Sequence, residues 1–253
     1  MLPLGLSLSI LAAVAAAPAA WPWIAGTVLL NHVVLAAAAM TPRGRALGPN
    51  VDRLPESAAR RSEVALTFDD GPDPDVTPRV LDLLDEHGAR ASFFLIGRRA
   101  EQHPDLASEI ARRGHRLENH TYRHANTFAF YPSWSQRRDI ERAQHILEDA
   151  GGRRPSYFRA PAGIRNPWLE PVLGRLGLSL ASWTRRGFDT VDGDPDRVER
   201  RLLDGLAPGD ILLLHDGSAA RGGSGRPVVL EVLPRVLGTL AERGLRSVSM
   251  PSP

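Results

Sequence analysis

The chain contains no cysteine among its 253 residues. This absence excludes disulfide bonds, thiolate metal ligands and a cysteine nucleophile, although it leaves the redox compartment open. Any metal must therefore be bound by histidine, carboxylate or water. Lysine is also absent, so all 31 basic residues are arginines. The pI of 9.6 reflects arginine and not a large excess of charge, because the formal net charge is only +2.

Acidic residues number 29 and are interspersed with the arginines along the chain. Nucleic-acid-binding proteins instead tend to cluster basic residues, with aromatic side chains between them. We therefore expect no nucleic-acid partner. With 43% hydrophobic residues, the chain is long enough to bury one sizeable core.

Charged residues are missing from one long stretch, residues 2–40. This predicts a membrane segment, because a helix that spans a bilayer needs roughly 20 apolar residues. Pro18 and the Trp-Pro-Trp sequence after it divide the stretch into 2–17 and 24–40, which slightly favours two short helices over one. A cleavable signal peptide is the competing interpretation, since Ala15 and Ala17 suit processing, but no basic residue precedes the apolar run.

We expect this segment to anchor the protein in a bacterial-type inner membrane. Arg43, Arg45 and Arg53 follow it, and positive charge beside a span usually stays cytoplasmic, but the side of the membrane is left open. The polar stretch that comes next has Gly and Pro and no clear period, which predicts a linker. The expected domains are a membrane segment over 1–40, a linker over 41–62 and a soluble domain over 63–253.

From residue 63 onward, apolar runs of strand length alternate with segments of helical period. Such alternation predicts right-handed crossovers and a parallel sheet, closed or nearly closed into an α/β barrel. An open doubly wound sheet is the alternative. Seven strands are predicted, at 63–68, 91–96, 115–119, 156–159, 178–183, 210–214 and 245–249. Helices are predicted between them at 76–87, 104–113, 135–150, 166–176, 196–206 and 228–243.

Polar residues stand at the carboxyl ends of several predicted strands, where barrel enzymes build their active sites. The first strand runs into TFDDGPD, and two adjacent carboxylates after an apolar strand are costly unless something such as a metal neutralises them. Helix capping by Asp69 or Asp70 is the simpler explanation. Capping needs only one carboxylate, however, and Gly71 and Pro72 separate both from the next helix.

The third strand ends in NHTYRH, in which His120 and His124 are four residues apart. Both imidazoles can converge on one point from a turn or a helical start. Such a pair alone is more often surface or core than ligand, but beside Asp70 a metal site is favoured. Two histidines and one aspartate leave coordination positions open for water and a substrate oxygen, which suits a catalytic divalent ion.

Two later strands also end in charged or titratable groups. The sequence FRAPAG presents Arg159, which can orient a carboxylate through two parallel hydrogen bonds, although an ordinary surface arginine is the simpler explanation. The sequence ILLLHDG delivers His215 from an apolar run. A histidine there is a natural general acid, because a nearby carboxylate can move its pKa towards neutrality.

Together, TFDDGPD, HTYRH, RAPAG and LLH occur in an order that resembles the polysaccharide deacetylase family, whose core is the NodB homology domain of carbohydrate esterase family 4. The resemblance covers roughly residues 63–249. It implies a distorted seven-stranded parallel (β/α) barrel that binds zinc or a similar divalent ion. The activity it implies is the hydrolysis of N-acetyl groups on amino sugars of a polysaccharide or glycoconjugate of the cell envelope.

The resemblance also implies roles for individual residues. Asp69 would be the general base and Arg159 would hold it in place. The backbone N–H of Ala162 would stabilise the oxyanion, and Leu213 would line the acetyl pocket. His215 would protonate the leaving amine. The metal ligands would be Asp70, His120 and His124.

The fourth motif departs from the family pattern. The family usually carries two Asp and a Trp after the fifth strand, whereas here the stretch reads WTRRGFDT, with Arg186 and Thr190 in the other places. Asp189 remains and is expected to tune the general acid, but substrate contacts in this region should differ. Glu118 stands where Gly is common in the family, and strand alternation predicts that it points the same way as His120, as an outer partner of the metal site.

Three other functions are weighed against a polymer deacetylase. The membrane segment and the altered fourth motif suit a deformylase or deacetylase of a lipid-linked sugar intermediate. A catalytically silent sugar-binding module would keep the fold but would have little need for the whole set of carboxylates and histidines. A metal-dependent phosphoesterase would be expected to show more ligands or a second metal. The expected partners are therefore an N-acylated amino-sugar polymer or a lipid-linked sugar, and the membrane.

Overall fold

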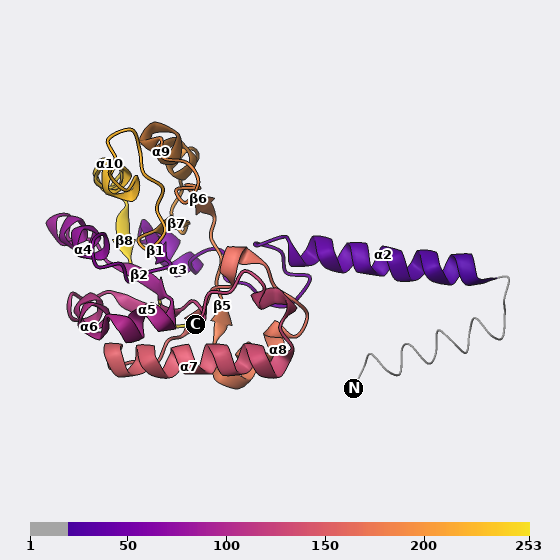
Figure 1. The fold of residues 1–253 in the computed structure, drawn as a ribbon. Coiled ribbons are helices and arrows are strands. Elements are labelled where there is room, and N and C mark those ends of the chain that lie inside the picture. The colour runs from indigo at the N-terminus through magenta and orange to yellow at the C-terminus, as the bar shows by residue number, and fades with distance from the viewer. Residues whose placement is uncertain (1–19) are drawn as a thin grey trace. The chain divides into compact units, whose positions relative to one another are not determined.

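The computed structural model describes residues 20–253 and divides into two units after Thr41. The first unit contains helix α2 (Trp21–Ala39), which has 19 residues, carries no Asp, Glu, Lys or Arg and is long and apolar enough to cross a membrane. A signal sequence would pass the same test of length and composition. The other predicted short helix, over 2–17, lies outside the described residues. The second unit begins at Pro42 (Figure 1).

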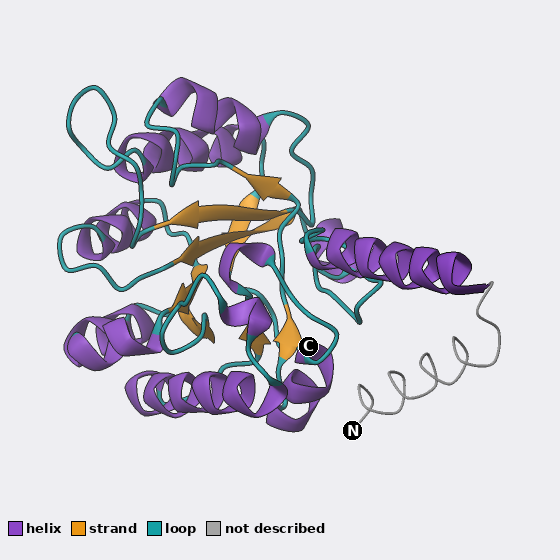
Figure 2. Cartoon of the chain, turned by 45° about the vertical axis from the view of Figure 1, so that its right-hand side comes forward, coloured by secondary structure: helices purple, strands orange, loops and turns teal. Residues whose placement is uncertain are grey.

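The second unit is built on a parallel sheet that curls into a half-barrel, with helices around its outer side (Figure 2). This confirms the predicted distorted parallel barrel. The start of β1 (Glu63–Asp69) also pairs with β8 (Arg246–Val248). The strand order across the sheet is β5 (Ser179–Leu180), β4 (Tyr157–Phe158), β3 (Arg116–Asn119), β2 (Ala91–Leu95), β1, β7 (Ile211–His215) and β6 (Arg185–Arg186).

Each of the seven predicted strands has a counterpart in the sheet, and each of the six predicted helices between them is present. The structure adds the two-residue strand β6 and two short helices. The helices of this unit are α3 (Glu56–Arg60), α4 (Thr77–Glu86), α5 (Gly97–Gln102), α6 (Pro104–Arg112), α7 (Ser133–Gly151), α8 (Leu169–Leu176), α9 (Pro195–Leu203) and α10 (Val229–Glu242), with 3-10 turns η2 (Phe128–Phe130) and η3 (Pro161–Gly163).

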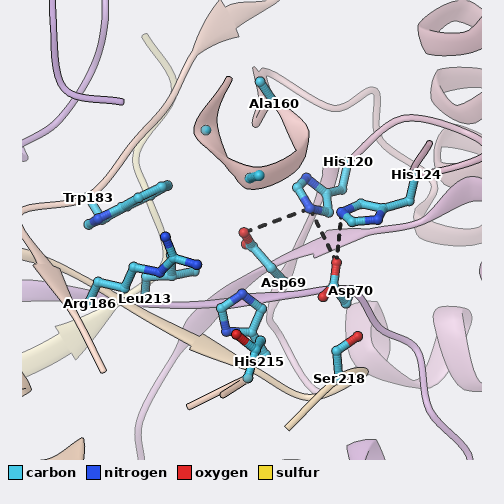
Figure 3. Close-up of a pocket in the computed structure, with 13 residues that line it drawn as sticks. Asp69, Asp70, His120, His124, Ala160, Trp183, Arg186, Leu213, His215 and Ser218 are labelled. Carbon is cyan, nitrogen blue, oxygen red and sulfur yellow. Dashed lines mark ion pairs between the residues drawn. The ribbon is translucent and has the colours of Figure 1, made fainter. Parts of the chain in front are cut away.

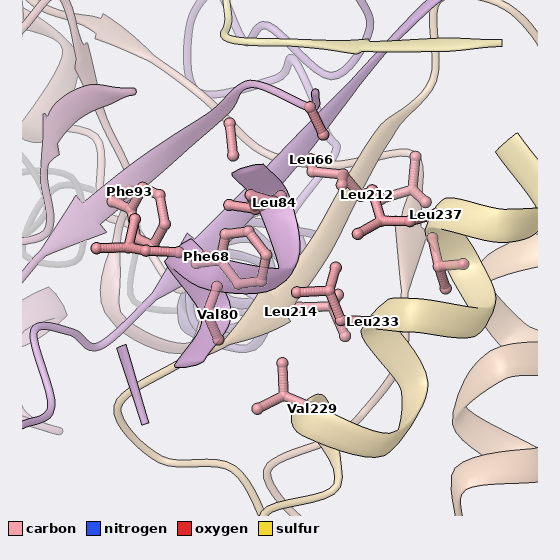
Figure 4. Packing of buried hydrophobic residues seen from close by; sticks show 14 of the residues in the cluster. Leu66, Phe68, Val80, Leu84, Phe93, Leu212, Leu214, Val229, Leu233 and Leu237 are labelled. Atoms are coloured by element: carbon pink, nitrogen blue, oxygen red, sulfur yellow. The ribbon is translucent and has the colours of Figure 1, made fainter. Parts of the chain in front are cut away.

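Strand alternation divides the core into an outer and an inner part. Leu66 and Phe68 of β1 pack with Leu212 and Leu214 of β7 against α4 and α10, as Figure 4 shows. The residues between them on these strands face the inside of the half-barrel, where an inner cluster forms from Ala65, Ile211, Leu213, Phe94 and Trp183 among others. Both faces of the central strands are therefore buried, which explains their continuous apolar runs.

The segment expected to be a linker packs onto this unit. Val51 forms a parallel bridge with Ala181 after β5, and Arg53 forms an antiparallel bridge with Asp210 before β7. Leu54 is buried in the inner cluster. The segment thus connects the β5 side of the open sheet to the β7 side. Its polar composition conceals this role, because only a few apolar residues anchor it.

The anchoring role of the segment predicts that Leu54→Ala destabilises the unit by about 2–4 kcal/mol, because truncating a buried leucine loses apolar contacts and leaves a cavity. Chemical denaturation in detergent solution measures the free energy of unfolding. Val191→Ala is the control, since Val191 is 79% exposed and should change stability by less than about 0.5 kcal/mol. A similarly small effect of Leu54→Ala would mean that the segment is a loose linker after all.

Candidate metal centre and active-site cavity

The end of β1 places two carboxylates side by side in a tight turn. Asp69 is the last residue of the strand, and Asp70 follows with a φ of 73°. Gly71 comes next because no side chain fits there: a Cβ atom at this position would lie 2.3 Å from Oδ2 of Asp216. Neither Asp69 nor Asp70 caps α4, since Asp73 accepts the hydrogen bonds from the backbone N–H groups that precede this helix.

The turn after β3 brings the two histidine rings together. His120 follows the strand directly, and its Nδ1 donates a hydrogen bond to the backbone carbonyl of Arg159 at 2.9 Å. That bond leaves Nε2 as the ring nitrogen with a free lone pair. Thr121 and His124 both have positive φ, and the Thr121 hydroxyl accepts a hydrogen bond from the backbone N–H of His124. The ring centroids of the two histidines are 4.7 Å apart.

These two turns converge on one oxygen atom. Oδ1 of Asp70 lies 3.3 Å from Nε2 of His120 and 3.2 Å from Nε2 of His124, as the dashed lines in Figure 3 mark. It is buried and has no hydrogen-bond donor among the described residues. One ligand atom from each of the three residues lies within 4.8 Å of the other two.

The arrangement fits a divalent ion. Ligands about 2.0–2.1 Å from an ion in tetrahedral geometry lie roughly 3.3 Å from one another, close to the two separations between Asp70 and the imidazoles. Burial opposes ionisation of Asp70, but the electrostatic influence of the neighbouring imidazoles of His120, His124 and His215 outweighs it and lowers the pKa of this carboxyl. The carboxylate is therefore in its ligating form, and the structure brings together the residues predicted as ligands.

Arg159 fixes the orientation of Asp69. The guanidinium is buried, and its Nη1 donates to Oδ1 of Asp69 at 2.6 Å and to the hydroxyl of Thr67 at 2.9 Å. Nη2 donates to the carbonyl of Ser182, and the guanidinium carbon lies 3.9 Å from the ring centroid of Phe94. The predicted pair of parallel hydrogen bonds to the carboxylate is thus wrong in detail, because one nitrogen bonds Asp69 while the other holds a backbone carbonyl.

His215 is held by Asp189 at the end of β7. Its Nδ1 lies 2.8 Å from Oδ1 of Asp189, and its backbone N–H donates to Oδ2 of the same carboxylate at 2.7 Å. Burial lowers the pKa of His215, but the hydrogen bond and charge of Asp189, together with the charges of Asp69 and Asp70, outweigh it and raise the pKa above its usual value. The ring therefore keeps its proton to a higher pH than a free histidine.

These side chains open onto one cavity of about 270 Å³ (Figure 3). Arg159 and Asp189 do not line it and instead support its walls from behind. Six lining residues were not predicted as site residues. Trp183, Arg186 and Thr190 belong to the altered fourth motif, Ala160 and Gly163 lie in RAPAG, and nothing in the sequence marks Ser218. The lining residues are Asp69, Asp70, His120, His124, Ala160, Ala162, Gly163, Trp183, Arg186, Thr190, Leu213, His215 and Ser218.

The backbone around the cavity is unusual. Six described residues other than glycine have a positive φ, which side chains with a Cβ atom disfavour. One of them, Ser62, precedes β1 on the opposite side of the sheet. The other five lie in the loops around the cavity: Asp70, Thr121, His124, Ala162 and Phe188.

Glu118 has a different role from the one expected. Its carboxylate accepts hydrogen bonds from the backbone N–H groups of Ser156 and Tyr157, at 2.8 and 2.7 Å. Burial raises the pKa of Glu118 to about 7 despite these bonds. Among its described contacts there is none with His120. The Glu118 side chain therefore links β3 to the start of β4. Within the described residues it does not make the expected contact with the metal site.

Comparison with known proteins agrees with this geometry. The sequence model of the family described as polysaccharide deacetylase matches residues 56–181. A chitooligosaccharide deacetylase of Azorhizobium caulinodans is 36% identical over 76% of this chain and 94% of its own length. A peptidoglycan-N-acetylglucosamine deacetylase of Bacillus cereus is 35% identical over 76% of this chain and 68% of its own length.

A solved structure supports the same assignment. The crystal structure of the Bc1960 peptidoglycan N-acetylglucosamine deacetylase superposes with a TM-score of 0.71 and 31% identity, covering 80% of this chain and 91% of that one. The likeness includes the curled sheet on which the cavity is built. The fold, the family match and the sequence identity over about three quarters of this chain lead to one conclusion: this chain belongs to the polysaccharide deacetylase family.

Proposed function

We propose that this protein is a metal-dependent hydrolase that removes N-linked acetyl groups from amino sugars of a cell-envelope polysaccharide or glycoconjugate. The observation that carries the proposal is the convergence of Asp70, His120 and His124 beside a second, immobilised carboxylate, Asp69. The names of the relatives, which are deacetylases of chitooligosaccharide and of peptidoglycan N-acetylglucosamine, support the same substrate class. Zinc suits the two imidazoles and one carboxylate.

The residues of the cavity divide the chemistry among them. A bound divalent ion supplies Lewis-acid polarisation and a lower pKa for water. Asp69, whose Oδ2 lies 3.9 Å from Nε2 of His120, takes the proton of the attacking water as general base. Ala162 and Leu213 both line the cavity: we assign the backbone N–H of Ala162 to stabilising the oxygen that becomes negatively charged, and Leu213 to the space for the acetyl methyl group.

The amide nitrogen must receive a proton before it can leave as an amine. His215 supplies it, because its Nδ1 is engaged by Asp189 and its raised pKa keeps the ring protonated. Arg159 does not touch the reacting atoms in this scheme. It positions Asp69 through its side chain and His120 through its backbone carbonyl.

We further propose that α2 anchors the enzyme in the inner membrane of a bacterial-type envelope. The length and apolar character of α2 support an anchor, and a signal sequence is the alternative. Arg43 and Arg45 follow the helix at a position where positive charge commonly flanks a span. Membrane flotation of the expressed protein, with detection of the N-terminal peptide by mass spectrometry, distinguishes a retained anchor from a cleaved leader.

The deacetylase activity is tested by measuring acetate released from N-acetylated chitooligosaccharide and from peptidoglycan fragments. We expect release that stops after treatment with a chelator and returns when Zn²⁺ is added. No metal-dependent release from any of these substrates would contradict the proposed function and favour a silent sugar-binding module. Release of formate in place of acetate, from a formylated lipid-linked sugar, would point to a deformylase.

Asp69 and Asp70 should respond differently to the same conservative change. Asp70→Asn is expected to lose both bound metal and activity, because it removes a ligand charge. Asp69→Asn should retain the metal while kcat falls by about 10²–10⁴-fold, because only the general base is lost. Metal content by mass spectrometry and acetate release measure the two effects. The exposed Asp149→Asn is the control, and equal metal loss in both site variants would show that Asp69 is itself a ligand.

Asp189→Asn should change the pH dependence of the reaction. The charge of Asp189 helps to raise the pKa of His215. Removing that charge lowers the pKa, so the general acid loses its proton at a lower pH. The alkaline limb of the kcat/KM profile should therefore move to lower pH, while the acid limb stays in place. Asp192→Asn removes the same charge from the same loop and should leave both limbs unchanged. An unshifted alkaline limb in Asp189→Asn would remove His215 as the general acid.

A further inference from the structure

Arg186 is a cation on the cavity wall for which no residue in the described part of the chain supplies a counterion. It lies on β6, in register with Leu213 of β7. Its guanidinium carbon is 5.3 Å from the ring centroid of Trp183 and 4.8 Å from that of Phe188, so aromatic faces flank it. Within residues 20–253 it forms no side-chain hydrogen bond or ion pair, and its Nε is buried without a partner.

The neighbouring arginine shows that this is a property of the position and not of the strand. Arg185, on the same two-residue strand, donates from Nε to Asp210 at 3.2 Å and also bonds the carbonyls of Asp204 and Gly205. Its charge is therefore compensated at the start of β7. Arg186 points the other way, as strand alternation requires, and lines the cavity.

The carboxylates around the cavity are already engaged by other groups. Asp69 accepts from Arg159, Asp70 faces the two imidazoles, and Asp189 holds His215. Figure 3 shows the Arg186 guanidinium beside Trp183 and Leu213, on the opposite side of Asp69 from His120 and His124. A cation on this side of the cavity, away from the two histidines, can contact a substrate group next to the reacting amide without touching the reacting atoms.

We propose that Arg186 binds an oxyanion carried by the substrate, so that the enzyme prefers an acidic amino sugar to a neutral one. The inference rests on the proposed function and specifies its substrate. A planar guanidinium matches carboxylate and phosphate equally well through two parallel hydrogen bonds. The oxyanion is thus either a carboxylate on an ether substituent of the sugar ring or a phosphate on its anomeric carbon. Thr190 also lines the cavity, and its hydroxyl is a further hydrogen-bond donor available to such a group.

The test compares three substrates with the metal-loaded, full-length enzyme: N-acetylchitotetraose, a matched oligosaccharide that carries 3-O-lactyl carboxylates, and N-acetylglucosamine 1-phosphate. Arg186→Gln should lower kcat/KM for the acidic substrate by about 10–100-fold, chiefly through KM, and leave the neutral substrate unchanged. Arg186→Lys should restore part of the loss, because it returns the charge without the planar fork. Loss confined to the lactyl or to the phosphate substrate identifies which oxyanion is bound.

Arg200→Gln is the matched control, since Arg200 is an exposed arginine of α9 outside the cavity and its loss changes the net charge equally. It should leave all three rates unchanged. The proposal is overturned if Arg186→Gln affects acidic and neutral substrates to the same degree, or if the wild type shows no preference for the acidic ones.

A binding measurement separates this proposal from the proposed activity. Calorimetric titration of N-acetylglucosamine 1-phosphate and of the free lactyl-substituted sugar, each against neutral N-acetylglucosamine, reports the oxyanion site without turnover. Tighter binding of an acidic sugar that Arg186→Gln abolishes would support the site even if no acetate were released. If Arg186→Gln does not fold, the wild type decides: equal Kd values for acidic and neutral sugars at low salt overturn the proposal.

Discussion

A single buried arginine holds the catalytic geometry together. The Arg159 side chain crosses the inside of the half-barrel from β4 to bond Asp69 and Thr67 of β1, and it also bonds the Ser182 carbonyl after β5. Its own carbonyl orients His120. One residue thus fixes both the proposed general base, Asp69, and one of the proposed metal ligands, His120. Leaving a buried charge unpaired costs several kcal/mol, so loss of either partner would disturb the sheet interior as well as the site.

The period of the strands explains why a charged centre can lie against an apolar core. On β1, Leu66 and Phe68 face the outer helices, whereas Thr67 and Asp69 face inward to Arg159. The polar side chains that line the cavity lie at or beyond the carboxyl ends of the strands, where the loops can add further ligands. The apolar residues nearer the strand starts fill the remainder of the interior and shield the carboxylates from water. The hydrogen bonds and ion pairs of these carboxylates are therefore stronger than they would be in water.

The sequence was sufficient to predict which strands carry the site residues. It was not sufficient to predict the contacts that side chains make across the interior of the sheet. Asp70, His120 and His124 could be grouped because each follows a predicted strand, and parallel strands end at one edge. The actual bonds of Arg159 depend on the distance to Ser182, which no local pattern encodes. Strand β6 was missed because Arg185 and Arg186 have no apolar signal, and the anchoring of residues 51–54 was missed because it depends on bridges to distant strands.

The five left-handed residues around the cavity have a further consequence. Each such conformation costs of order 1 kcal/mol for a residue with a Cβ atom, and persists only where the surroundings enforce it. The fold therefore incurs this cost once, when the chain folds, and the ligating atoms need little rearrangement each time a sugar arrives. These loops lower the stability of the domain but hold the site in its binding conformation. Stabilising substitutions in them would therefore slow turnover more readily than substitutions elsewhere in the chain.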